Sequence, residues 1–290
     1  MRRLFFDRSD GRRIKHKDPI LRLIPYIMPR RYDAQVFFDD DLVLDETEKL
    51  IKELRKEGHR VLFLHIVLAA ILRTMVEFPK SNRFVAGRKV YARNEYTYSF
   101  AMKKAFTMDA DETVVKVRLQ AEDTLFDVIE KINKAILENR EESNKNETDK
   151  AAKVLNLMPG FLLRGAVAFI RFLDNHRMMP KFLINASPFH SSAFVTDLGS
   201  LGIKPVYHHI YDFGTTSFFI AFGTKEKHLD LTKEHEVKKL RKMSLKIAVD
   251  ERICDGYYFA QTIKRLKSHI KNPSRLLEKP KDRPKDNEIA

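Results

Sequence analysis

The chain has 290 residues, of which 43% are hydrophobic and 32% charged, a composition that excludes a wholly disordered protein and allows a sizeable core. Its formal net charge is +14, but residues 1–31 carry 10 Lys and Arg against 3 Asp and Glu, and residues 264–285 carry 9 against 2, so the rest is balanced. Charge that is confined to the chain ends is typical of solvated segments. The sequence also has no zinc-finger spacing and no aromatic–basic pattern, so we predict no nucleic-acid partner. Basic ends that attract an anionic ligand, such as a nucleotide-bearing acyl carrier, remain an alternative.

The first 19 residues form a basic N-terminal segment. Pro19, Pro25 and Pro29 argue against a long helix and predict an extended or turning entry into a domain over 20–275. A strand is expected at 34–38. Acids in the first turn and basic residues near the end predict a helix at 45–58.

Two apolar segments, 61–76 and 161–173, are the candidates for membrane helices. Each is shorter than the roughly 20 residues that a bilayer requires, and each is interrupted by charged or histidine side chains. We therefore expect buried helices and no membrane partner. An interfacial helix at 161–173 remains an alternative.

The rest of the chain mixes strands and helices. A polar insertion is expected at about 138–150, and the Pro- and Lys-rich residues 276–290 read as a disordered basic tail. Strands are predicted at 84–91, 96–102, 112–121, 192–198, 217–223 and 243–249, and helices at 62–78, 124–137, 151–157, 161–175 and 257–263. This order predicts an α/β (α+β) two-layer sandwich, a mixed β-sheet covered by helices.

The turn Asp250-Glu251-Arg252-Ile253-Cys254-Asp255-Gly256 lies between the last predicted strand and the last helix. It resembles the His-x-x-x-Asp-Gly signature of the chloramphenicol acetyltransferase and dihydrolipoamide acyltransferase superfamily, with Glu251 at the position of the catalytic histidine. Two further passages are similar in order: the helix–Pro–Asn–strand passage around Pro79 and Asn82, and Thr196-Asp197-Leu198-Gly199 before the strand at 217–223. The resemblance covers most of 20–275 and implies a chloramphenicol acetyltransferase-like fold.

The resemblance also implies a site and an assembly. It implies a homotrimer with sites at subunit boundaries, a coenzyme A thioester as acyl donor, and a small-molecule acyl acceptor. Thr196 would stabilise the oxyanion, and Asp255 would pair structurally with Arg30 or Arg31. Because no lipoyl-bearing segment is recognised before residue 20, a free-standing catalytic domain is expected.

Glu251 departs from the family at its most demanding position. Free thiols have a pKa near 8.5 and carboxylates a pKa near 4.3. A carboxylate is therefore a poorly matched base for a thiol unless burial raises the pKa of the carboxylate. Three interpretations stay open: burial makes Glu251 a stronger base, His208 or His209 supplies the base, or the fold has lost catalysis and serves as a trimeric binding or scaffold protein.

Three remaining features bear on the chemistry. Cys254 is the single cysteine, so no internal disulfide forms, which favours a reducing compartment and predicts a cytoplasmic protein. Its apolar and acidic neighbours favour a structural role over a nucleophilic one. His65 and His190 are expected in the core and in a loop, and no metal site is predicted. The leading interpretation is an acyl-CoA-dependent acyltransferase with an unknown acceptor.

Overall fold

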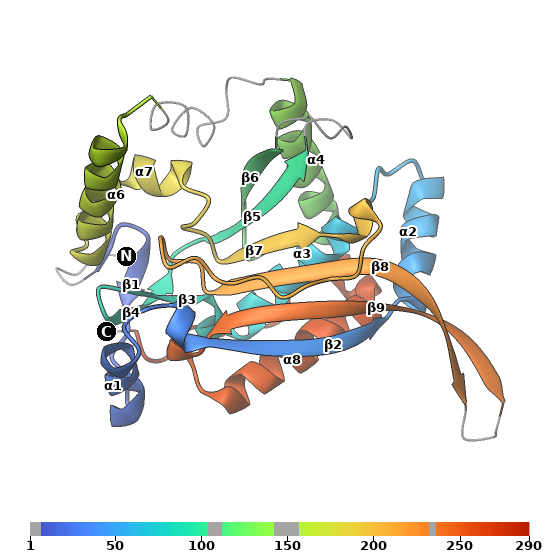
Figure 1. Cartoon of the computed structure of the whole chain (residues 1–290). Coiled ribbons are helices and arrows are strands. Elements are labelled where there is room, and N and C mark those ends of the chain that lie inside the picture. Colours follow the sequence, from blue (N-terminus) through green and yellow to red (C-terminus); the bar gives the residue numbers. More distant parts are fainter. Residues whose placement is uncertain (1–6, 104–111, 142–156, 232–235, 290) are drawn as a thin grey trace.

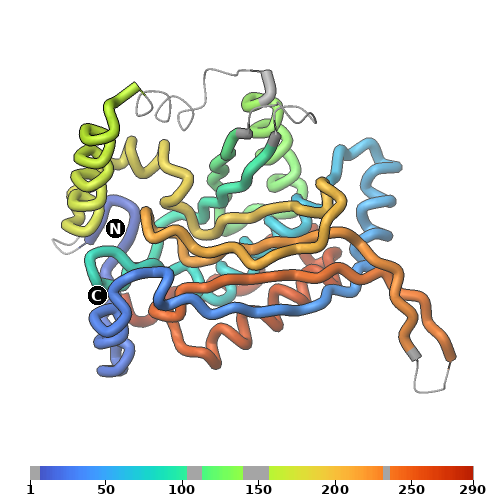
Figure 2. Tube along the Cα trace, viewed as in Figure 1, coloured from blue at the N-terminus to red at the C-terminus, as the bar shows by residue number. Residues whose placement is uncertain are grey.

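The computed structural model describes residues 7–103, 112–141, 157–231 and 236–289 (Figures 1 and 2). Within these residues, six strands form the main sheet in the order β2–β9–β8–β7–β5–β6, and three form a small sheet in the order β1–β4–β3. The strands are β1 (Gly11–Arg13), β2 (Gln35–Val43), β3 (Arg83–Ala86), β4 (Lys89–Arg93), β5 (Tyr96–Lys103), β6 (Glu112–Leu119), β7 (Ala193–Asp197), β8 (Phe218–Leu231) and β9 (Val237–Asp250). The helices are α1 (Pro19–Ile27), α2 (Asp45–Lys56), α3 (Phe63–Glu77), α4 (Leu125–Glu141), α6 (Gly160–Asn175), α7 (Lys181–Ala186) and α8 (Gly256–Lys271).

The main sheet is mixed, as the sequence predicted. β5, β7 and β8 run parallel to one another, and the other neighbouring pairs are antiparallel. Alternate residues of β9, such as Leu245 and Ile247, join Val195 and Ile220 in a core shared with α3 and α8. The predicted fold class, a mixed sheet covered by helices, is confirmed.

Helix α3 is buried on nearly all sides, which explains its continuous apolar sequence. Its two interrupting polar residues have structural partners. His65 accepts a hydrogen bond at Nδ1 from the backbone N–H of Leu62 at 3.0 Å, and burial lowers the pKa of His65 to about 4. Arg73 donates to the backbone carbonyls of Arg275, at 3.1 Å, and Glu278. His65 is therefore a core histidine, as expected.

The opposite face of the sheet carries a second, smaller cluster that includes Phe194, Phe219 and Ala248. The irregular segment 202–211 crosses this face, and its Ile210 is buried against the cluster. The backbone N–H of Ile210 donates to Oε1 of Gln35 at 2.6 Å, which fixes the segment to β2. A loop therefore covers this face near β2 and β8, and α7 lies against it at β6, where Nζ of Lys116 donates to the Ile184 carbonyl at 2.5 Å.

Two predictions for the N-terminal half of the chain, the extended entry and the strand at 84–91, were wrong. The entry is helical: the Asp18 side chain caps α1 by accepting from the N–H of Ile20 at 2.8 Å, and Pro19 occupies the first turn, where no N–H is needed. The predicted strand 84–91 is a hairpin, β3 and β4, joined by a two-residue turn at Gly87 and Arg88.

At both ends of the chain, the residues that the structure describes belong to the fold. β1 pairs with β4, and Ile14 bridges Ile289, so the boundaries at 19 and 276 do not separate ordered from disordered chain (Figure 1). The expectation of a disordered tail is wrong for residues 276–289. Asp286 makes a two-bonded ion pair with Arg83, with both contacts at 2.6 Å and side-chain exposures of 2% and 0%. Composition could not show this pairing, because Arg83 lies about two hundred residues earlier in the chain.

Asp286→Asn is expected to destabilise the chain by about 3 kcal/mol, because it leaves the buried Arg83 guanidinium short of charge compensation. Asp282→Asn, at an exposed site, is the matched control and is expected to stay within about 0.5 kcal/mol. Urea unfolding at a fixed protein concentration measures both. Equal stability of the two variants would show that the C-terminal segment does not stabilise the fold.

Helix α6 also differs from expectation. It is not a buried helix: Phe161 is 75% exposed, Phe169 61% and Phe172 50%. No helix in the described part of the chain is long and apolar enough to span a bilayer. Residues 138–141 of the predicted insertion continue α4; residues 142–150, and all but the last residue of the helix predicted at 151–157, lie outside the described residues.

Candidate active site

The acidic turn forms one compact connection between sheet and helix. β9 ends at Asp250, a short 3-10 helix follows at Glu251–Ile253, and α8 begins at Gly256. Oδ1 of Asp250 accepts from the N–H of Arg252 at 3.2 Å, and Oδ1 of Asp255 accepts from the N–H of Tyr258 at 2.9 Å. Each aspartate thus caps the helical segment that follows it.

Asp250 is the centre of a buried ion cluster. Its carboxylate contacts Nε and Nη2 of Arg252 at 2.7 Å each and Nε of Arg31 at 3.3 Å. The guanidinium groups satisfy their other donors on backbone carbonyls: Arg252 on Met28 at 3.0 Å, and Arg31 on Gly214 and Val85 at 2.9 Å each. The cluster therefore ties the turn to three distant segments of the chain, at residues 28–31, 85 and 214.

The predicted pairing of Asp255 with Arg30 or Arg31 is wrong in this structure. Arg31 pairs with Asp250, and Arg30 is exposed and donates to the hydroxyl of Tyr32 at 2.7 Å. Asp255 is exposed at the start of α8. Arg31 is buried, and so is Asp250 at the end of β9, so these two residues can pair. Asp255, at the start of α8, faces solvent.

Glu251 lies between Asp250 and Arg252 in the sequence, but its side chain takes no part in their ion cluster. Its side chain is partly exposed, and it makes no hydrogen bond or ion pair with the described residues. The short helix that carries it lies against α1 and β3. The carboxylate is therefore available to a ligand while the backbone beneath it is fixed.

Thr196 is placed in a similar way at the end of β7. It shares a sheet face with Phe194, away from α3 and α8, and is partly exposed. Its hydroxyl makes no hydrogen bond within the described ranges. The next residue, Asp197, accepts from the N–H of Ser200 at 3.1 Å; burial raises the pKa of Asp197, and this hydrogen bond only partly offsets the rise. A Cβ at Gly199 would come within 2.4 Å of the Gly223 carbonyl, so glycine is required in this turn.

Thr196 and Glu251 do not meet within one chain. Thr196 is in register with Ala221 and, through it, with Lys246, whereas Glu251 follows Asp250 four residues further along β9. Thr196 is therefore separated from Asp250, the neighbour of Glu251, by roughly 13 Å along the strands and 10 Å across them. In Figure 1, β7 and β9 point toward opposite ends of the sheet, which places their C-terminal ends apart.

His208 and His209, the predicted alternative bases, lie in the irregular segment 202–211 and not on a strand. The His208 ring stacks on Phe219 with 4.5 Å between centroids, and its Nδ1 lies 3.1 Å from the Val206 carbonyl. His209 is exposed and meets Tyr211 edge to face at 5.2 Å. Neither imidazole is brought to Glu251 by these contacts.

Two other reactive residues are structural. Cys254 is 1% exposed, and burial raises the pKa of its thiol well above the ordinary value, which opposes a role as nucleophile. His190 is buried, with Nδ1 at 2.7 Å from the Ser187 hydroxyl and Nε2 at 3.4 Å from Asp174. Among residues 7–103, 112–141, 157–231 and 236–289, no group of three or more His, Cys, Asp or Glu could hold a metal ion.

A cationic cavity of about 550 Å³ lies next to the acidic turn, and sequence reasoning missed it. Its lining includes Arg252, Arg30, Arg88 and Arg171, with Asp212 among the few acids. The arginines come from four separate segments of the chain, so no local sequence motif predicts that they meet. The adjacent basic pairs Arg30-Arg31 and Arg88-Lys89 each line the cavity, but two neighbouring basic residues are too common in sequences to predict a site.

Comparisons with known proteins agree on the fold. Residues 187–278 match the family model of the 2-oxoacid dehydrogenases acyltransferase (catalytic domain), a span that contains Thr196, Glu251 and Asp255. No curated protein matches the sequence.

Solved structures cover nearly the whole chain. A probable dihydrolipoamide acetyltransferase from Listeria monocytogenes is 12% identical, with a TM-score of 0.56 and coverage of 88% of this chain and 94% of that one. The dihydrolipoamide acetyltransferase of Azotobacter vinelandii, whose catalytic mechanism has been studied through a serine, a histidine and an asparagine, is 14% identical, with a TM-score of 0.57 and coverage of 91% and 94%. A chloramphenicol acetyltransferase is 9% identical, with a TM-score of 0.52 and coverage of 90% and 99%. The chain therefore has the fold of dihydrolipoamide acetyltransferases and chloramphenicol acetyltransferase, and its residues 187–278 carry the pattern of the 2-oxoacid dehydrogenase acyltransferase catalytic domain.

Proposed function

We propose that this chain is an acyltransferase that moves an acyl group from a coenzyme A thioester to a small-molecule acceptor. The observation that carries the proposal is that Thr196 and Glu251 both fall within the family match and both keep side chains free of partners among the described residues. Both side chains are partly exposed, so they can contact a ligand without breaking a hydrogen bond within the described chain. Two unpaired groups at the motif positions are therefore what a site awaiting substrate requires.

Each residue has a defined step in this reaction. The Glu251 carboxylate takes the proton from the acceptor's thiol or hydroxyl as that atom forms its bond to the thioester carbonyl carbon. The Thr196 hydroxyl donates a hydrogen bond to the oxyanion that develops. When the carbon–sulfur bond breaks, the proton passes from Glu251 to the departing thiolate, and the carboxylate is regenerated. Asp255 has a structural role as the cap of α8.

We propose a homotrimer whose sites lie at subunit boundaries. The separation of Thr196 and Glu251 in one chain supports this arrangement, because a heterologous interface can place one protomer's threonine against its neighbour's glutamate. Exposed apolar side chains on α1, such as Ile20 at 67% and Ile27 at 73%, and on α6 supply surface that an assembly would cover. The lone cysteine supports a cytoplasmic location.

The cavity beside Arg252 is suited to an anionic substrate. Arg30, Arg88 and Arg171 line it and outnumber its acids, so it favours a phosphate-bearing donor such as coenzyme A over a neutral molecule. The residues that line this cavity do not identify the acyl acceptor.

A second candidate is a trimeric binding or scaffold protein that has lost catalysis. It is favoured by Glu251 itself, because a carboxylate repels a developing thiolate, whereas an imidazole does not. Asp197 adds a further acid beside Thr196. This candidate predicts coenzyme binding without turnover.

Release of the coenzyme A thiol from several acyl-CoA donors separates the two candidates. Thr196→Val is expected to lower turnover by about 10²–10³-fold, because it removes the oxyanion's hydrogen-bond donor at nearly constant shape. Thr224→Val, at a partly exposed threonine of the next strand, is the matched control and is expected to keep wild-type turnover. Thiol release that is equal in the two variants, or coenzyme binding with no release in the wild type, would contradict the acyltransferase proposal.

A further inference from the structure

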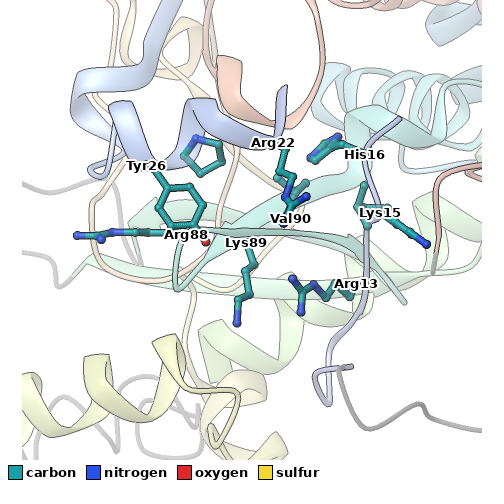
Figure 3. A pocket seen from close by; sticks show the side chains of 10 residues that line it. Arg13, Lys15, His16, Arg22, Tyr26, Arg88, Lys89 and Val90 are labelled. Atoms are coloured by element: carbon teal, nitrogen blue, oxygen red, sulfur yellow. The ribbon is translucent and has the colours of Figure 1, made fainter. Parts of the chain in front are cut away.

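A second cationic pocket, of about 360 Å³, lies between α1 and the β3–β4 hairpin. Figure 3 shows Arg22 and Tyr26 extending from α1 toward the hairpin residues Arg88 and Val90. Six basic side chains line the pocket, Arg13, Lys15, His16, Arg22, Arg88 and Lys89, and no acid lines it. A concave surface of one charge sign concentrates counter-ions of the opposite sign.

Part of the positive charge of this pocket has no acidic partner in the described chain. The side chains of Lys15, Arg22 and Arg88 form no ion pair with any described residue. Glu288, which lies beside His16, shares its carboxylate with Lys80 at 3.0 Å and Arg83 at 3.2 Å. The side chains of Lys15, Arg22 and Arg88 are exposed, so solvent screens their repulsion, and together they make the binding of an anion favourable.

His16 gives a second, independent indication of a ligand. Its side chain is 5% exposed, and its Nε2 is buried without a hydrogen-bond partner in the described chain. Its Nδ1 lies 3.4 Å from Glu288 without hydrogen-bond geometry. Buried polar atoms are rarely left unpaired, so an acceptor from outside the chain is the natural partner for the imidazole.

Arg88 is held in a strained conformation at the mouth of the pocket. Gly87 and Arg88 have φ angles of 54° and 61°, and a Cβ at Gly87 would lie 2.1 Å from the Asn175 carbonyl. Glycine is therefore required at Gly87, but not at Arg88. A residue with a side chain in the left-handed region costs about 1 kcal/mol, and such strain is typically kept at functional sites.

We propose that the pocket between α1 and the β3–β4 hairpin binds the phosphate or diphosphate group of a small molecule. Guanidinium groups match phosphate oxygens in charge and in two-bonded geometry, and the cavity volume suits a diphosphate with part of its organic substituent. Arg88 and Lys89 also line the larger cavity beside Arg252, so one ligand can extend from one cavity to the other. The pocket's ligand chemistry does not depend on acyl transfer.

Calorimetric titration with inorganic pyrophosphate tests this assignment. We expect the wild type to bind it, with affinity that falls as ionic strength rises. Arg88→Gly is expected to weaken binding about tenfold by removing one charged donor, while the thermal midpoint stays equal or rises because the backbone strain is relieved. Arg22→Ala/Lys89→Ala is expected to weaken binding about 100-fold. Lys52→Ala/Lys264→Ala removes the same charge from exposed helix positions and is expected to bind as the wild type does.

Absence of pyrophosphate binding, or equal weakening in the Lys52→Ala/Lys264→Ala control, would overturn the proposal. The source of the phosphate is decided by repeating the titration with saturating coenzyme A. Loss of pyrophosphate binding then assigns the pocket to the coenzyme's phosphates, and unchanged binding assigns it to a different phosphorylated molecule. An inactive wild type that still binds pyrophosphate would refute the acyltransferase proposal and leave this one standing.

Discussion

Glu251→Gln is expected to lower acyl transfer from acyl-CoA by about 10²–10⁴-fold, the usual cost of losing a positioned general base. The amide keeps the size of the side chain but cannot accept the proton. Because Glu251 has no protein partner among the described residues, the substitution should leave the unfolding transition within about 0.5 kcal/mol of wild type. Thiol release and urea unfolding, measured on the same preparation, separate catalysis from stability.

Glu53→Gln, at an exposed position of α2, is the matched control and should leave turnover unchanged. Glu251→His completes the series, since it restores the residue type that the resemblance places there. If only the histidine variant turns over and the wild type is inert, the site is degenerate and the scaffold function is favoured. Equal turnover in the glutamine variant and the wild type would remove Glu251 from the mechanism.

Asp250→Asn is expected to destabilise the fold by about 3–5 kcal/mol. It leaves the guanidinium groups of Arg31 and Arg252 buried without their shared carboxylate, and breaking a buried ion pair from one side carries that cost. The side-chain exposure of Asp250 is 0%, so water cannot replace the lost charge. Thermal and urea unfolding at fixed protein concentration measure the effect.

Asp255→Asn provides the matched control five residues further along the chain. Asparagine caps helices about as well as aspartate does, so a loss of under about 0.5 kcal/mol is expected. The pair of variants also tests the revised pairing directly. A larger loss at Asp255 than at Asp250 would restore the pairing that the family resemblance implied.

The architecture was predictable because strands and helices leave a periodic trace in the sequence. The alternation around Leu245 and Ile247 and the apolar run of α3 identified core elements correctly, and the acidic turn was correctly placed between a strand and a helix. Periodicity shows which residues face inward, but not which distant segment they meet.

Errors arose where a distant partner decided the outcome. Arg83 orders a C-terminal segment whose composition alone reads as disordered. Burial selects Asp250 over Asp255 as the partner of Arg31. Asp18 and Pro19 start a helix, since proline in the first turn removes no needed donor, and α1 continues through Pro25. The cationic pockets combine arginines from separate segments, which no local pattern reveals.

Complementation between two inactive variants tests the central claim most directly. Glu251→Gln and Thr196→Val protomers are unfolded together, mixed in equal amounts and refolded into shared oligomers. If each site takes Glu251 from one protomer and Thr196 from its neighbour, about one quarter of the sites are intact and thiol release recovers to about that fraction of wild type. No recovery above the separate variants, in oligomers shown to be mixed, would contradict a site shared across the subunit boundary.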